Sequence, residues 1–317
     1  MKKKKKILII GAGALGSGIG GLLAKAGHDV VFLGRKKNMD AISKNGLKIT
    51  GIFGDYHISK IKTEINIKNL KNPNIIFFLV KSYDTEKIAK KIKHLVQGET
   101  MVISLQNGIG NEEILEKIIG KNKILGGLIF IAFELLKPGL VKITANPGKL
   151  IFGEMNQKLT KRAKELEKIL NHAKIPSQAV NNIKDQLWNK LLFNAMLNPL
   201  GALFNVQYGE LTKNKYTWKI IQNIIKEIFQ ISKKEKIKLI KNTPKEYEKI
   251  LLEKMMPKAK DHLSSMLYDI NKKKKTEIDA ITGQVIKFGK KHNISTKTNE
   301  TIYNLIKFKE TLNLKQN

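Results

Sequence analysis

Residues 6–16 read KILIIGAGALG, and this stretch decides the fold of the first part of the chain. An aliphatic run that ends in glycine predicts a buried strand, and the pattern after it predicts a helix over 14–26. Gly11, Gly13 and Gly16 form G-x-G-x-x-G, which permits a tight turn, close approach of a pyrophosphate and close packing of helix on strand. The motif in this context predicts a Rossmann-type dinucleotide-binding loop. Its cofactor-binding residues are predicted to be Gly11, Ala12, Gly13, Ala14, Leu15 and Gly16.

The same alternation of strand and helix continues through the first half of the chain. Further aliphatic runs lie at 29–34, 74–80, 100–105 and 123–133, and helical patterns lie at 85–94, 111–118 and 159–172. Strands that alternate with helices indicate a parallel sheet with crossover helices. Residues 47–67 read as short β-like pieces, and 140–154 reads as a hairpin.

After about residue 181 the strand patterns stop. Helices are predicted over 183–199, 216–237, 246–255, 276–291 and 298–313. A chain of 317 residues is long enough for two domains of ordinary size. We therefore predict an α/β N-terminal Rossmann-type dinucleotide-binding domain over 1–181, followed by an all-α C-terminal domain over 182–317 that binds the substrate and carries the catalytic residues.

The net charge of +32 raises the question of a nucleic-acid or membrane partner. Only two of the 59 basic residues are arginines, and the lysines are spread along the chain rather than gathered among aromatic residues, as a strand-binding groove requires. Lys, Asn and Ile are all encoded by A/T-rich codons, so genome composition explains the excess. We expect no nucleic-acid partner.

Other classes of protein are disfavoured by residue usage. The chain has no cysteine, and its six histidines are scattered, so we predict no disulfide and no metal site. Only four aliphatic residues follow the basic start before Gly11, far fewer than a signal peptide or a membrane span needs. We expect a cytoplasmic protein that is not bound to a membrane.

Arg35 follows the second predicted strand, where NAD-binding domains usually carry an acid that holds the ribose hydroxyls. The sequence there is LGRKK, without any acid. A guanidinium can bind the 2′-phosphate of NADP through paired hydrogen bonds. The alternative is an ordinary lysine-rich loop, but arginine is rare in this chain, so we predict NADPH as the cofactor.

Three other strands or helices place polar residues where a ligand could bind. Lys81 follows the third core strand and Asn107 follows the fourth, at the sheet edge where ligands of such folds bind; each could also be a plain turn residue. Lys190, Asn194 and Asn198 recur every four residues, so they lie on one face of an otherwise apolar helix. This stripe is either a polar ladder between helices or the wall of a site.

The sequence resembles the ketopantoate reductase (2-dehydropantoate 2-reductase) family over nearly its whole length. The matching pieces are GAGALGS (11–17), the Arg35 position, LVKSYD (79–84), QNGIGNEE (106–113), WNKLLFNAMLNPLGALFNVQYGEL (188–211) and SSMLYDINKKKKTEID (264–279). The resemblance implies NADPH-dependent reduction of 2-dehydropantoate to (R)-pantoate, a step of pantothenate and coenzyme A biosynthesis.

The resemblance also implies roles for single residues. Lys190 matches the general acid of the family. The implied substrate-binding residues are Asn107, Asn194, Asn198, Ser265 for the carboxylate and Glu277 for the hydroxyl. Lys81, Asn107 and Glu277 match residues that also contact the cofactor. These roles suit the chemistry, because reduction of a keto group needs a cation that can donate a proton to the developing alkoxide.

Structural alternatives exist for two of these residues. Glu277 could be an acid at a helix start, beside a capping pair of Thr276 and Asp279, and Ser265 could be a helix cap. For the whole protein, one rival is a reductase of another small keto or hydroxy acid, and the other is a non-catalytic NADP-binding redox sensor. We expect a small-molecule substrate and a monomer or homodimer.

Overall fold

The computed structural model describes residues 4–145 and 148–315, and the chain divides into two compact units. The α/β unit contains Met1–Gln106 and Asn111–Ile183, and the helical unit contains Asn107–Gly110 and Lys184–Asn317. The main division therefore lies beside the boundary expected at 181–182. The short segment 107–110 groups with the helical unit, which the sequence pattern did not indicate.

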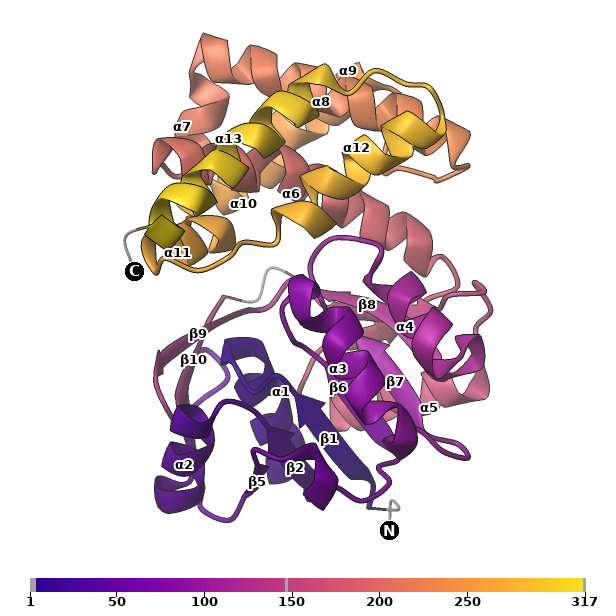
Figure 1. Ribbon diagram of the computed structural model, residues 1–317, viewed down its shortest axis with the longest axis vertical. Helices are drawn as coiled ribbons and strands as arrows, with labels where there is room; N and C mark the ends of the chain where they lie inside the picture. Colours follow the sequence, from indigo (N-terminus) through magenta and orange to yellow (C-terminus); the bar gives the residue numbers. More distant parts are fainter. Residues whose placement is uncertain (1–3, 146–147, 316–317) are drawn as a thin grey trace. The chain divides into compact units, whose positions relative to one another are not determined.

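A central sheet of eight strands forms the core of the α/β unit, in the order β12-β11-β8-β7-β6-β1-β2-β5 (Figure 1). Its strands are β1 (Lys6–Ile10), β2 (Asp29–Leu33), β5 (Lys62–Glu64), β6 (Ile75–Phe78), β7 (Met101–Ser104), β8 (Ile124–Ile129), β11 (Leu150–Glu154) and β12 (Ser177–Ala179). All neighbours are parallel except β11 and β8. Both faces of the central strands are buried, which explains their unbroken aliphatic sequences.

Helices cover this sheet. They are α1 (Ala14–Lys25), α2 (Lys36–Asn45), α3 (Thr85–Ile92), α4 (Asn111–Ile119) and α5 (Lys161–His172). Apolar residues of α1 and α5 join one core cluster with alternate residues of the central strands. In Figure 1, α3 and α4 lie in front of β6 and β7. The predicted helices of this unit are confirmed, but α2 was missed because its first residues are lysines rather than an apolar pattern.

A second sheet of four strands, in the order β4-β3-β10-β9, corrects two predictions. Its strands are β3 (Leu47–Gly51), β4 (Tyr56–Ile58), β9 (Ala132–Lys137) and β10 (Leu140–Ala145). The run 123–133 is not one strand, because β8 belongs to the first sheet and β9 to the second. The predicted hairpin over 140–154 is also wrong, because β10 and β11 lie in different sheets. The true hairpin pairs β9 with β10 through a turn at Gly139, whose φ is +75°.

The described part of the helical unit contains helices and turns only. Its helices are α6 (Ile183–Phe204), α7 (Tyr208–Lys213), α8 (Lys215–Lys234), α9 (Pro244–Ile250), α10 (Met256–Ala259), α11 (Ser265–Asn271), α12 (Thr282–Lys291) and α13 (Lys297–Lys315). Helix α6 continues past Pro199, because buried apolar residues on its last turns compensate for the missing hydrogen bond.

Two helix predictions in this unit need correction. The helix expected over 246–255 is α9 followed by a π-helical turn over Leu251–Met255 and then by α10. The helix expected over 276–291 begins only at Thr282, after a 3-10 turn over Ile278–Ala280. Along the described chain, no helix has the length and apolarity needed to cross a membrane.

Candidate active site

The glycine loop after β1 has the geometry of a nucleotide cradle. Gly11 has a φ of +97°, and a Cβ added there would lie 2.6 Å from the backbone of Leu79. A Cβ at Gly16 would lie 2.3 Å from the carbonyl oxygen of Gly11, whereas a Cβ at Gly13 would meet no atom of the described residues within 4 Å apart from those of its own chain neighbours. The fold therefore requires glycine at 11 and 16, and the open space over Gly13 is where a phosphate would approach the backbone.

Helix α1 begins directly after this loop at Ala14, and no side chain caps its first turn. The positive end of the helix dipole and the backbone N–H groups of the first turn are thus directed at the loop. These features fit a dinucleotide phosphate group. The described residues contain no cluster of histidine and acidic side chains that could hold a metal ion.

Arg35 is exposed and lies between β2 and α2. Asn38 anchors this turn to the glycine loop, because its Nδ2 donates to the carbonyl of Ala12 at 2.6 Å and its Oδ1 accepts from the backbone of Gly139 at 2.9 Å. The guanidinium therefore projects from a backbone that is fixed relative to the phosphate cradle.

Lys81 follows β6 at the carboxyl edge of the sheet and is partly buried. The backbone beside it is braced by Gln106, whose Nε2 donates to the carbonyl of Val80 at 2.9 Å and to the hydroxyl of Thr85 at 2.7 Å. The Lys81 side chain is thus attached to a braced backbone segment at the end of β6, within the α/β unit.

In the helical unit, α6 carries Lys190, Asn194 and Asn198 on one face, and both asparagines are buried. Burial lowers the pKa of Lys190 to about 8, while the negative charge of Glu277 acts in the opposite direction. Asn198 Oδ1 accepts a hydrogen bond from the hydroxyl of Tyr208 at 2.5 Å. This bond fixes the amide so that its oxygen faces Tyr208.

Glu277 is buried and contacts the short segment that joins the helical unit from the sheet edge. Asn107 Nδ2 donates to Glu277 Oε2 at 3.4 Å, and the backbone N–H of Ile109 donates to the carbonyl of Ala280 at 3.0 Å. Gly108, with φ of +84°, packs directly against that carbonyl. The structure therefore brings together Asn107 and Glu277, with Lys190 within range of the Glu277 charge.

Ser265 is the first residue of α11 and is exposed. The helix is capped instead by the preceding Ser264, which is buried and whose Oγ accepts from the backbone of Leu267 at 3.0 Å. The capping alternative considered for Ser265 therefore applies to Ser264. The role of Ser265 toward a substrate carboxylate stays a prediction.

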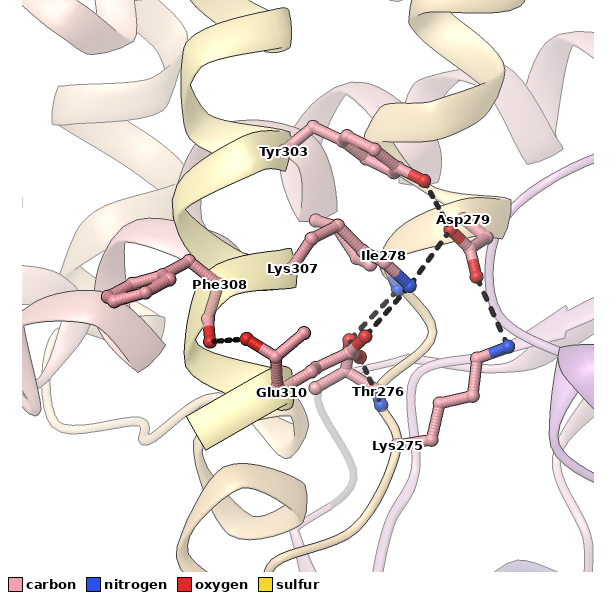
Figure 2. A network of polar contacts seen from close by, with 9 residues as sticks. Lys275, Thr276, Ile278, Asp279, Tyr303, Lys307, Phe308 and Glu310 are labelled. Atoms are coloured by element: carbon pink, nitrogen blue, oxygen red, sulfur yellow. Dashed lines mark hydrogen bonds and ion pairs between the residues drawn. The ribbon is translucent and has the colours of Figure 1, made fainter. Parts of the chain in front are cut away.

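Thr276 and Asp279 do not form the capping pair considered above (Figure 2). Thr276 donates through its backbone and its hydroxyl to the carboxylate of Glu310 on α13. Asp279 accepts from the hydroxyl of Tyr303 at 2.7 Å and pairs with Lys275 at 3.5 Å. Glu277 thus lies directly before the 3-10 turn over Ile278–Ala280, where its side chain makes no capping bond, and not at the start of α12, which begins five residues later.

Comparison with known proteins decides the family. The family described as ketopantoate reductase PanE/ApbA matches residues 7–157, and its C-terminal part matches residues 182–310. A 2-dehydropantoate 2-reductase of Aquifex aeolicus is 37% identical over 98% of both chains. This chain belongs to the ketopantoate reductase family.

Solved structures of this and a related activity share the fold. A PanE/ApbA family ketopantoate reductase from Ralstonia eutropha JMP134 matches with a TM-score of 0.89 and 26% identity, covering 98% of this chain and 99% of the other. A ternary structure of D-mandelate dehydrogenase with NADH and anilino(oxo)acetate matches with a TM-score of 0.87 and 26% identity, covering 97% and 99%. The fold thus occurs in proteins named for two different activities, ketopantoate reductase and D-mandelate dehydrogenase.

Sequence reasoning missed the residues that hold the candidate site residues in place. Asn38 anchors the Arg35 turn, Tyr208 orients Asn198, and Glu310 holds the loop of Glu277. None of them shows a local pattern, because each acts through a contact with a distant segment. Only Tyr208 had a signal in the sequence, because it lies within the piece 188–211 that resembles the ketopantoate reductase family.

Proposed function

We propose that this protein reduces 2-dehydropantoate to (R)-pantoate with NADPH, as a step of pantothenate and coenzyme A biosynthesis. The observation that carries the proposal is the environment of Lys190. Burial lowers the pKa of this lysine to about 8, and the negative charge of Glu277 acts on it. Lys190 also shares one helix face with two buried asparagines. A cation with this acidity can both attract a developing oxyanion and release its proton near neutral pH.

The reaction needs one hydride and one proton. NADPH, when bound, supplies the hydride to the carbonyl carbon of the substrate. Lys190 donates a proton from Nζ to the carbonyl oxygen as negative charge develops there, which gives the alcohol and leaves a neutral amine. Solvent then returns a proton to Lys190, so that the next cycle starts from the ammonium form.

The remaining residues of the helical unit orient the substrate. Asn194 and Asn198 offer neutral donors, which fix the substrate without cancelling the charge of Lys190. Ser265 binds the carboxylate. Glu277 accepts a hydrogen bond from the substrate hydroxyl, and Asn107 donates a hydrogen bond to the Glu277 carboxylate.

The α/β unit binds the cofactor. The open backbone at Gly13 and the start of α1 receive the pyrophosphate, and the exposed guanidinium of Arg35 binds the 2′-phosphate that distinguishes NADPH from NADH. Lys81, Asn107 and Glu277 contact the nicotinamide half.

The decisive experiment measures NADPH oxidation with a panel of 2-keto acids. It includes 2-dehydropantoate and a branched 2-keto acid of similar size that lacks the hydroxyl. Without the hydroxyl, the buried carboxylate of Glu277 loses the donor that the substrate supplies, so kcat/KM should differ by about 100-fold or more, and the difference should shrink in Glu277→Ala. Equal turnover of both acids would contradict the assignment of 2-dehydropantoate as the substrate. No turnover of any acid would favour a non-catalytic sensor.

A second candidate is an NADH-dependent reductase of another 2-keto acid. It is favoured by the likeness to D-mandelate dehydrogenase, whose structure contains NADH. It is also favoured by Glu64, an acid on β5 that lies opposite Leu33, the last residue of β2. The same panel, repeated with NADH and with an aromatic 2-keto acid added, separates the two candidates.

A further inference from the structure

Glu310 is a buried carboxylate far along the chain from the candidate site residues. It lies on α13 and is only 5% exposed, yet it accepts two hydrogen bonds from one residue of the loop before α12. The backbone N–H of Thr276 donates to Glu310 Oε1 at 2.7 Å, and the Thr276 hydroxyl donates to the same oxygen at 2.6 Å (Figure 2). Lys307 pairs with the other oxygen at 2.9 Å. The Thr276 N–H, the Thr276 hydroxyl and the Lys307 ammonium group are all hydrogen-bond donors, so both oxygens of the Glu310 carboxylate have a donor as partner.

Thr276 passes this restraint on to both sides of Glu277. Its hydroxyl oxygen also accepts from the backbone N–H of Ile278 at 3.2 Å. Thr276, directly before Glu277, is therefore bound to Glu310. Ile278, directly after Glu277, is bound to the Thr276 hydroxyl that Glu310 orients. The carbonyl of Glu277 accepts from Ala280 at 3.1 Å. Little freedom is left in the backbone that directs the Glu277 side chain.

A second contact ties the same loop to the same helix. Asp279 accepts from the hydroxyl of Tyr303 at 2.7 Å, and Lys307 lies 3.7 Å from it while pairing with Glu310. Figure 2 shows both carboxylates facing Lys307. Helix α13 thus holds the loop on both sides of Glu277.

From these contacts we infer that Glu310 is a positioning residue for the reaction: through Thr276 it fixes the direction in which Glu277 presents its carboxylate to the substrate hydroxyl and to Lys190. The inference rests on the function proposed above and deepens it. Glu310 itself contacts neither substrate nor cofactor in this role. Displacement of a reacting or orienting group by about 1 Å can lower a rate by roughly 100-fold, so the contact matters although it is indirect.

The test is a double-mutant cycle on the full chain with Glu310→Ala and Glu277→Gln. Glu310→Ala should lower kcat/KM for 2-dehydropantoate by roughly 10- to 100-fold and change the dissociation constant of NADPH by a smaller factor. In the Glu277→Gln background the same change should cost little, because the residue through which it acts is already altered. Glu310→Gln keeps an oxygen acceptor for Thr276 and should show a smaller loss.

The pH profile gives a readout that loss of stability alone would not change. Glu277 raises the pKa of Lys190 against the effect of burial. If Glu310→Ala displaces the Glu277 carboxylate, the alkaline limb of kcat/KM should move to lower pH, as it should in Glu277→Gln.

Glu227→Ala is the matched control. The Glu227 carboxylate accepts from the backbone of Thr298 at 2.9 Å and of Asn299 at 3.1 Å, at the start of the same helix α13. This variant should lower the melting temperature and leave kcat/KM within about twofold of the parent. If Glu310→Ala behaves in the same way, or if its loss is fully additive with Glu277→Gln, Glu310 is only structural and the inference is wrong.

Failure of the proposed function can be told apart from failure of the inference about Glu310. A parent protein that prefers another 2-keto acid contradicts 2-dehydropantoate as the substrate, and the double-mutant cycle is then measured with that acid. A parent that reduces none of the acids overturns the proposed function and the role of Glu310 with it. If Glu310→Ala does not fold, Glu310→Gln and the shift of its pH profile decide the question.

Discussion

Lys190 combines an ammonium group with a largely apolar helix, and burial lowers its pKa to about 8. As the proposed general acid it must be protonated in the reduction direction. We therefore expect kcat/KM to be level below about pH 8 and to fall about tenfold per pH unit above it.

Lys190→Ala should lower kcat by roughly 100- to 10,000-fold and leave NADPH binding nearly unchanged. A variant that keeps kcat within a few-fold of the parent would show that another group donates the proton.

Arg35 carries the prediction about the cofactor. If its contacts to the 2′-phosphate are worth about 2–3 kcal/mol, NADPH should bind roughly 30- to 150-fold more tightly than NADH. Arg35→Ala should remove most of this preference by weakening NADPH alone, and high salt should reduce it in the parent. Lys36→Ala is the control, because Lys36 already pairs with Asp40 at 2.7 Å. Equal dissociation constants of the parent for both dinucleotides would refute the assignment.

At the scale of elements, the start of α7 orients a residue of α6. Tyr208 donates to the buried Oδ1 of Asn198, so the Asn198 amide group keeps its N–H donors on the opposite side. In Tyr208→Phe the oxygen loses this partner, at a cost of about 1–3 kcal/mol, and the amide can turn over. We expect KM for the keto acid to rise several-fold, with a smaller change in kcat.

Tyr247→Phe provides the matched control for Tyr208→Phe. Tyr247 is fully buried in the same unit, and its hydroxyl has no hydrogen-bond partner among the described residues. Removal of the Tyr247 hydroxyl should leave KM for the keto acid unchanged. The free energy of unfolding should stay the same or increase. Equal KM values for the two variants would show that the Tyr208 hydroxyl does not orient Asn198.

At the scale of the whole molecule, one buried acid makes folding stability depend on pH. Glu112 is 1% exposed, and burial, together with the charge of Glu113, raises its pKa from 4.5 to about 8. Below pH 4.5 both folded and unfolded chains hold this proton. Between 4.5 and 8 only the folded chain holds it, so the free energy of unfolding falls as pH rises through this window, by up to about 5 kcal/mol.

Glu112→Gln removes this titration. Relative to the parent, the variant should gain stability steadily from pH 5 to pH 8, as measured by denaturant unfolding at several pH values. The exposed Glu99 offers the control, and Glu99→Gln should shift stability little at any pH. A difference between Glu112→Gln and the parent that does not change with pH would mean that Glu112 is ionised in the folded protein.

The sequence by itself determined the features that depend on neighbours along the chain. Aliphatic runs and glycine spacing predict β1, α1 and the parallel order, because a strand buried on both faces must be apolar throughout. A spacing of four predicts that Lys190, Asn194 and Asn198 share a face, because helix geometry requires it.

Tertiary structure alone decided which distant segments meet. It divided 123–133 between two sheets, paired β10 with β9 rather than β11, and grouped 107–110 with the helical unit. It also decided that α12 begins only at Thr282, and that the Thr276 N–H and hydroxyl bind the Glu310 carboxylate 34 residues away. A buried donor must find some acceptor, but local sequence does not specify which one, since that choice depends on how the elements pack.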